Sequence, residues 1–237
     1  FFCLIAFGIL FYKYFLLIIN KYKPKFLIDD QYDKPQAFHE SPMSVAGGVC
    51  IFFSFLIIYF NFLLFQNIIF FEYLSFCTLF FFLGLADDLK INIRPKFRLI
   101  IMISALLILI VYNNFYIEKT GIEFLNRLLK IDIFTLFFVS LCFLFIINGA
   151  NLVDGFNGLL GIHSLIIITN LSIINYLSGN QNLAFFLLCG IIALIVFLKY
   201  NFPKSKIFLG DSGSYLLGAF IAVSVIKTSV ANPTISP

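Results

Sequence analysis

The sequence predicts an all-α, polytopic membrane protein, on the evidence of its composition and of the length of its apolar runs. Of its 237 residues, 61% are hydrophobic and 12% are charged, whereas a soluble domain has about 45–50% apolar and about 25% charged residues. About 20 helical residues cross a bilayer core of about 30 Å, and apolar runs of this length recur along the chain. We therefore expect one integral-membrane domain over residues 1–237, with about eight spans.

Each predicted span is an apolar run that ends at polar or helix-breaking residues. The first run ends at a lysine-rich connection, and the second opens at a pair of glycines. The third ends before Asp87, the fourth follows Pro95, and the fifth ends at Asn148. The last three are separated by a Gly-Asn-Gln break and by the connection that follows Tyr200. The eight runs cover residues 1–19, 44–65, 68–86, 97–113, 132–148, 159–178, 182–199 and 209–230.

Basic residues gather in alternate connections between these runs. The first, third and seventh connections carry 11 Lys and Arg residues, whereas the second, fourth and sixth carry only Lys119, Arg127 and Lys130. Membrane proteins carry an excess of Lys and Arg in their cytoplasmic loops. The sequence therefore predicts that the odd-numbered connections face the cytoplasm. The net charge of +4 is too small and too scattered to indicate a nucleic-acid partner.

Two adjacent carboxylates, Asp87 and Asp88, follow the third run. Both face the negative end of the helix dipole and each other, which costs some tenths of a kcal/mol to about 1 kcal/mol. One interpretation is a solvated helix end near Lys90 and Arg94. The other is a site for a divalent cation or for a metal carried by a substrate.

Amide and carboxylate side chains recur in the fifth connection. Asn148, Asn151 and Asp154 are spaced three residues apart, so a helical turn would place their oxygens on one face. Hard cations are bound by such oxygens. The alternative is a helix that stops and restarts, with Asp154 or Asn157 as the N-cap of the next span.

The seventh connection places Asp211 at the start of the last span. Asp211 is an ordinary N-cap candidate. A helix N-terminus also attracts phosphate, and Lys204 and Lys206 add positive charge beside it.

The first connection contributes residues 33–39, with Asp33, Lys34 and His39, before the glycines that open the second span. The alternative interpretation is a plain loop that ends at a helix start.

Together the four odd-numbered connections hold oxygens for a metal, lysines for phosphates and glycines for close approach, all on one face. This combination favours phosphoryl transfer between a soluble nucleotide and a membrane lipid. Such a reaction depends on charge neutralisation and positioning more than on a strong nucleophile.

The order of these motifs resembles the polyprenyl-phosphate N-acetylhexosamine-1-phosphate transferase family. Members of that family transfer a sugar 1-phosphate from a UDP-sugar to undecaprenyl phosphate or a related lipid. They release UMP and use Mg²⁺, for which Mn²⁺ is an alternative. The matching motifs are Asp33-Lys34-Pro35 with His39, Gly47-Gly48, Gly84-Leu85-x-Asp87-Asp88, Pro95-Lys96-x-Arg98, Asn148-x2-Asn151-x2-Asp154-Gly155, and Asn201 to Ser214.

The resemblance implies a role for each matching residue. Asp211 and Asn151 match the metal-binding positions. Asp87 and Asp88 match the paired aspartates near the metal and the acceptor phosphate, and Asp154 matches an acidic position that is essential in many bacterial members. Catalytic roles are therefore expected for Asp87, Asp88 and Asp154.

Substrate contacts are expected from a second group of residues. Lys96 matches a lysine that approaches the acceptor phosphate. Asn157 stands where the family has a second acidic residue, so a carboxylate role is lost there, while hydrogen bonding remains available. The remaining residues of this group are Asn148, His39 and Lys206.

The family also carries a His-x-His-His segment in a later cytoplasmic loop, and usually one or two further spans. On this basis we expect those parts to lie beyond Pro237 and the chain to be C-terminally truncated. The expected partners are a UDP-N-acetylhexosamine, polyprenyl (undecaprenyl) phosphate and the lipid bilayer, with a homodimer left open.

The resulting functional prediction is transfer of N-acetylhexosamine 1-phosphate in a bacterial inner membrane, at the start of a cell-envelope polysaccharide such as the O-antigen of lipopolysaccharide. The pattern from Asp33 to His39 favours N-acetylglucosamine 1-phosphate as the transferred group. One alternative is a phospho-N-acetylmuramoyl-pentapeptide transferase of peptidoglycan synthesis. A second is a membrane transporter, which is disfavoured because transporters place ionisable groups near the bilayer midplane.

Overall fold

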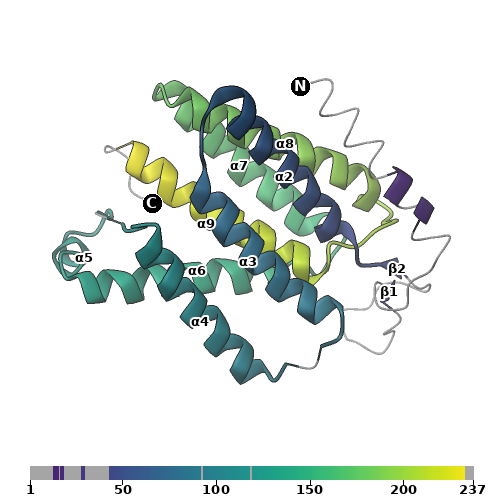
Figure 1. Ribbon diagram of the computed structural model, residues 1–237, viewed down its shortest axis with the longest axis horizontal. Coiled ribbons are helices and arrows are strands. Elements are labelled where there is room, and N and C mark those ends of the chain that lie inside the picture. Colours follow the sequence, from purple (N-terminus) through teal and green to yellow (C-terminus); the bar gives the residue numbers. More distant parts are fainter. Residues whose placement is uncertain are drawn as a thin grey trace.

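The computed structural model describes residues 13–15, 17–18, 28–29, 43–91, 93–117 and 119–232. The regular structure of this part of the chain is helical apart from one short antiparallel ladder, in which β1 (Ile28–Asp29) pairs with β2 (Met43–Ser44). Figure 1 shows the long helices arranged as one bundle. The helices are α2 (Gly47–Gln66), α3 (Phe71–Asp88), α4 (Pro95–Tyr112), α5 (Glu123–Leu128), α6 (Asp132–Val153), α7 (Leu159–Leu177), α8 (Gln181–Asn201) and α9 (Gly210–Ala231).

The predicted all-α membrane fold is confirmed, and α2 to α4 and α6 to α9 correspond to the second to eighth predicted runs. Among the described residues, six helices are long and apolar enough to cross a membrane: α2, α4, α6, α7, α8 and α9. Most of the predicted first span, 1–19, and of the first connection lies outside the described residues.

One predicted boundary is wrong. The fifth predicted run ended at Asn148, but α6 continues to Val153. The Asn148 amide donates a hydrogen bond of 2.8 Å to the Leu144 carbonyl one turn earlier, so this polar side chain is accommodated within the helix. The fourth connection contains the short helix α5.

Helix α9 forms the centre of the bundle. Nearly all of its residues from Ser212 to Ser224 are buried, and it packs against α2, α3, α6 and α7. Helix α3 lies antiparallel across it (Figure 1). Their close approach depends on Gly84, because a Cβ at this position would overlap the backbone of Asp211. The aromatic part of the core includes Phe186 of α8, whose ring lies 4.7 Å from that of Tyr73.

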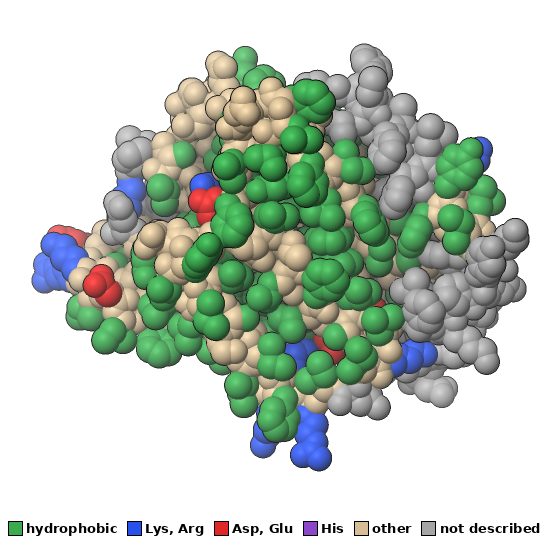
Figure 2. Space-filling model, viewed as in Figure 1, with side chains coloured by type: hydrophobic (Ala, Val, Ile, Leu, Met, Phe, Trp, Pro, Cys, Tyr) green, Lys and Arg blue, Asp and Glu red, His purple; other side chains and the backbone are tan. Residues whose placement is uncertain are grey.

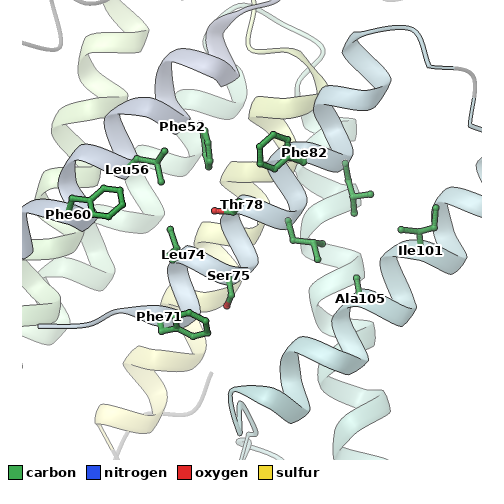
Figure 3. A pocket seen from close by; sticks show the side chains of 12 residues that line it. Phe52, Leu56, Phe60, Phe71, Leu74, Ser75, Thr78, Phe82, Ile101 and Ala105 are labelled. Atoms are coloured by element: carbon green, nitrogen blue, oxygen red, sulfur yellow. The ribbon is translucent and has the colours of Figure 1, made fainter. Parts of the chain in front are cut away.

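The outer surface of the bundle is apolar, as a bilayer requires. Hydrophobic side chains cover most of the face in Figure 2, and the charged side chains lie mainly toward its edges. Helix α4 packs against α6, and an apolar groove of about 770 Å³ opens between α2, α3 and α4. Phe52, Phe82 and Ile101 line this groove (Figure 3).

Candidate active site

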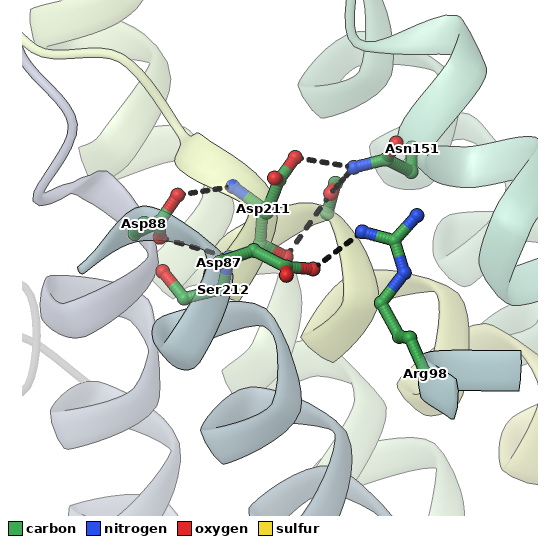
Figure 4. Close-up of polar contacts among 7 residues, drawn as sticks. Asp87, Asp88, Arg98, Asn151, Asp211 and Ser212 are labelled. Atoms are coloured by element: carbon green, nitrogen blue, oxygen red, sulfur yellow. Dashed lines mark hydrogen bonds and ion pairs between the residues drawn. The ribbon is translucent and has the colours of Figure 1, made fainter. Parts of the chain in front are cut away.

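The polar residues singled out in the sequence meet where four helices begin or end. Asp87 and Asp88 are the last residues of α3, and Arg98 lies in the first turn of α4. Asn151 lies near the end of α6, and Asp211 lies in the first turn of α9. Figure 4 shows these side chains directed toward one another. The antiparallel packing of α3 on α9 brings residues more than 120 positions apart into contact.

Asp88 contacts the backbone of α9. Its Oδ1 accepts a hydrogen bond of 2.8 Å from the Asp211 amide, and its Oδ2 accepts one of 3.0 Å from the Ser212 amide. The N-cap residue of α9 is Leu209, which makes no side-chain cap. The interpretation of Asp211 as an N-cap is therefore wrong, because Asp88 caps this helix from α3.

Asp87 forms an ion pair with Arg98. The distance from Arg98 Nη1 to Asp87 Oδ2 is 2.7 Å, and the Asp87 side chain is only 12% exposed. The Arg98 guanidinium carbon lies 6.0 Å from the ring centroid of Tyr215. The helix end is thus not simply solvated near Lys90 and Arg94, as one interpretation held. Arg98 had no predicted role, although its place one turn after the helix-opening Pro95 directs it back toward the end of α3.

Asn151 and Asp211, the two predicted metal-binding residues, are in contact. The Asn151 amide donates hydrogen bonds of 2.6 Å to Asp211 Oδ1 and 2.9 Å to Ser214 Oγ. A half-turn of the amide group would present its oxygen in place of its nitrogen. The pair can therefore supply one carboxylate and one amide oxygen to a hard cation.

Asp154 lies at the C-cap of α6. Burial, together with the negative charges of Asp211 and Asp88, raises the pKa of Asp154 to about 7. It does not cap the next span, and neither does Asn157, because the N-cap residue of α7 is Gly158, which has no side chain to cap the helix.

The cluster therefore contains four carboxylates, one of which, Asp87, is ion-paired with Arg98. Within the described ranges, no three His, Cys, Asp or Glu side chains converge as an all-protein metal site would require. Mg²⁺ binds differently, through one or two carboxylates together with water and substrate phosphates. The donor set at Asp211 and Asn151 fits such an ion, since it offers one carboxylate and one amide oxygen beside further carboxylates.

The predicted substrate-binding residues are not part of this hydrogen-bonded cluster. Lys96 and Lys206 are exposed, and Asn148 donates within its own helix. Asn157 is exposed and reaches the Pro203 carbonyl at 3.5 Å. His39 lies outside the described residues.

Asn201 has a structural role that the sequence did not indicate. Its side chain is buried, accepts a hydrogen bond of 2.6 Å from the Gly158 amide and donates one of 2.8 Å to the Ile207 carbonyl. Asn201 thereby joins the fifth connection to the seventh. Its only sequence signal was its place at the head of the last motif.

The seventh connection also pairs with the start of α2. The Gly47 and Gly48 amides donate hydrogen bonds of 2.8 Å to the carbonyls of Phe208 and Leu209, respectively. The Phe208 amide donates one of 2.7 Å to the Ser44 carbonyl. The glycines that open the second span are therefore part of the scaffold beside the site.

Comparison with known proteins identifies the family of this chain. Residues 70–229 match the model of the family described as glycosyl transferase family 4. The phospho-N-acetylmuramoyl-pentapeptide-transferase of Clostridium novyi is 33% identical over 151 residues, which are 59% of this chain and 46% of the relative. The Campylobacter jejuni (strain 81-176) protein of the same name is 33% identical over 207 residues, covering 76% and 59% of the two chains. The Dictyoglomus turgidum one is 35% identical over 200 residues, covering 80% and 61%.

The chain spans about half the length of the first of these relatives. The matched region includes α3, α4, α6 and α9 and so every residue of the cluster. It covers more than half of the chain. The chain belongs to glycosyl transferase family 4.

Proposed function

We propose that the protein transfers a phospho-N-acetylhexosamine from a UDP-linked donor to polyprenyl phosphate. The observation that carries this proposal is the convergence of the Asp87–Arg98 pair with the Asn151–Asp211 pair at helix ends. Such a site can meet a water-soluble nucleotide and a lipid headgroup at the same membrane surface. The transporter alternative is not favoured, because the acids of the cluster lie at helix ends.

In the proposed reaction, an oxygen of the lipid phosphate forms a bond to the sugar-bearing phosphorus of the donor. The bond between that phosphorus and the bridging oxygen of the diphosphate breaks, and UMP leaves. The acceptor is already largely ionised near pH 7, since the second pKa of a phosphate monoester is about 6. Arg98 holds the Asp87 carboxylate in one orientation, from which it can position the acceptor phosphate and take up its remaining proton.

Asp211 and Asn151 are the residues that would hold Mg²⁺, or Mn²⁺ in its place. When bound, the ion would neutralise charge on the diphosphate of the donor. Asp154 adds negative charge beside this pair.

The site is proposed to face the cytoplasm of a bacterial inner membrane. Its support is the excess of basic residues in the connections on the side of the cluster. A cysteine placed at an exposed position there, such as Lys206, should react with an impermeant maleimide in inverted vesicles only.

Two donors remain candidates. The names of the relatives support UDP-N-acetylmuramoyl-pentapeptide, which was the alternative expectation. The pattern from Asp33 to His39 supports UDP-N-acetylglucosamine, although these residues lie outside the described ranges. Competition between the two nucleotides for transfer to undecaprenyl phosphate distinguishes them, because label is incorporated from the true donor and the other nucleotide at micromolar concentration does not reduce that incorporation.

The decisive test is incorporation of label from each donor into lipid by the full-length protein in nanodiscs with Mg²⁺. Release of UMP in equal amount is expected. A matched control is Asp132→Ala, which removes an exposed acid from the opposite end of α6 and should leave transfer unchanged. Absence of transfer from both donors would refute the proposal.

A further inference from the structure

We propose that Asp88 is a positioning residue, which fixes the first turn of α9 and thereby directs Asp211, and which takes no part in proton transfer or metal binding. The inference deepens the proposed function, because the role of Asp211 rests on that function. It assigns the two adjacent aspartates to different tasks.

The hydrogen bonds of Asp88 are the first ground for this division. Each carboxylate oxygen accepts from a different backbone amide of α9, at 2.8 Å and 3.0 Å. Four amides at a helix N-terminus lack partners within the helix, and a carboxylate there is favoured by both hydrogen bonding and the helix dipole. Leu209 cannot supply such a cap from within α9. Asp88 of α3 therefore caps the N-terminus of α9 across the helix interface, as an N-cap side chain does within its own helix.

The packing around Asp88 leaves it little freedom. Gly210 has φ +76°, and a Cβ at this position would lie 2.8 Å from Asp88 Oδ2. One turn before Asp88, the absence of a side chain at Gly84 lets α3 touch the Asp211 backbone. The carboxylate is thus held against the amides it binds, with the backbones of both helices in contact.

Asp87 shows the contrasting arrangement. Its side chain accepts a hydrogen bond from Arg98 at Oδ2. Consecutive residues of a helix point about 100° apart, so the two carboxylates leave α3 in different directions (Figure 4). Asp87 keeps an oxygen for a substrate, whereas Asp88 has both oxygens engaged.

The consequence for the site runs through Asp211. The amide of Asp211 is held by Asp88, and its carboxylate is held by Asn151 at 2.6 Å. Without the contact between Asp88 and the Asp211 amide, the first turn of α9 can unwind. The Asp211 side chain then loses its fixed distance from Asn151.

The test combines hydrogen exchange with kinetics on the full-length protein in nanodiscs, using Asp88→Asn and Asp88→Ala. Amide exchange of the peptide covering residues 208–216 should accelerate about tenfold in Asp88→Ala and less in Asp88→Asn, which keeps one acceptor oxygen. Exchange elsewhere should not change. In transfer assays, kcat should fall in the same order while KM for the nucleotide stays within about twofold. If the substitutions only impaired folding, the amount of folded enzyme would fall, without a fall in kcat at nearly constant KM.

Two further variants complete the design. Asp87→Asn should abolish transfer with exchange of the 208–216 peptide unchanged. Glu72→Gln removes an acid from the other end of α3 and should leave that exchange unchanged as well. If Asp88→Ala does not fold, the isosteric Asp88→Asn decides alone.

Unchanged exchange in Asp88→Asn, or its complete inactivation with α9 still protected, would overturn the inference. The exchange measurement uses no substrate. Failure of the wild-type protein to transfer sugar phosphate would therefore refute the proposed function without touching the capping result.

Discussion

The two ends of the α3–α9 helix pair carry opposite charge arrangements. At the site end, four carboxylates lie near one arginine, and burial and mutual repulsion raise the pKa of Asp154. At the other end, Lys227 Nζ lies 2.6 Å from Glu72 Oε1, and both side chains are mostly buried. The Tyr73 hydroxyl adds a hydrogen bond of 3.0 Å to Ser224 Oγ.

The difference in charge between the two ends illustrates two roles of polar residues inside a membrane protein. Charges that serve only to join helices are matched, since an unpaired charge there is costly. Charges left unmatched by the protein are expected to meet a ligand of the opposite sign. The two ends thus differ in their charge balance, and four changes can test whether the imbalance marks the site.

The largest effect is expected at Asp211. Asp211→Asn should reduce transfer at least about a hundredfold, the scale seen when one preorganised electrostatic group is removed from an active site. Thermal stability without metal should stay equal or rise, because one repelling charge is lost. A fall in Tm together with retained activity would contradict the contrast between the two ends. Labelled transfer and a thermal melt in EDTA measure the two quantities.

At the opposite end, Lys227→Met should lower stability by about 1–3 kcal/mol, because it leaves Glu72 without its partner in a mostly buried position. The catalytic rate of the protein that remains folded should not change. The double variant Glu72→Gln with Lys227→Met should recover most of the loss. Urea or thermal melts of the three proteins check this, and a large loss of kcat in the single variant would mean that the ends are coupled.

A smaller effect is expected at Asn201, which joins two connections beside the site. Asn201→Ala leaves the Gly158 amide and the Ile207 carbonyl without their partner, which costs about 1–3 kcal/mol for a buried group. Transfer should fall by about tenfold as the connection that carries Asp154 loosens. Asn201→Asp keeps the acceptor for Gly158 and should lie between wild type and Asn201→Ala in both measurements.

The smallest effect is a stability difference that depends on pH. The pKa of Asp154 in the folded protein, about 7, lies above its ordinary value of 3.8. Its protonated form therefore contributes stability that is fully present below about pH 4 and is lost as the pH rises through 7. Asp154→Asn should thus raise Tm in EDTA at pH 8 by at least about 2–4 °C, the shift that about 1 kcal/mol gives in a chain of this size. The difference should vanish toward pH 4, and a constant difference across this range would show that charge is not its cause.

Much of the fold followed from the sequence because a bilayer imposes long apolar runs. The exceptions arose where polar side chains bond within a helix, as Asn148 does, since hydropathy alone ends the run there. The sequence motifs predicted Asp211 and Asn151 as metal-binding residues, and the structure brings the two side chains into contact. Their metal-binding role stays a prediction.

The partners of Asp87 and Asp88 were beyond the reach of the sequence. Adjacent positions in a motif gave no sign that one side chain would bind Arg98 and the other would cap a helix that begins more than 120 residues later. Such contacts depend on the crossing of α3 over α9, which periodicity does not encode. Asn201 escaped notice for the same reason, because its two partners lie in different connections.

The pairing of α3 with α9 also fixes the distance between the contacts at its two ends. Asp88 lies 16 residues after Glu72, and Lys227 lies 16 residues after Asp211. Both intervals therefore measure about 24 Å along a helix, and the two cross-links match at both ends. A single inserted or deleted residue inside either interval would shift one end by about 1.5 Å and turn it by about 100°, so that only one cross-link could be kept. Variation in length among such proteins is accordingly expected in the connections and not within these two intervals.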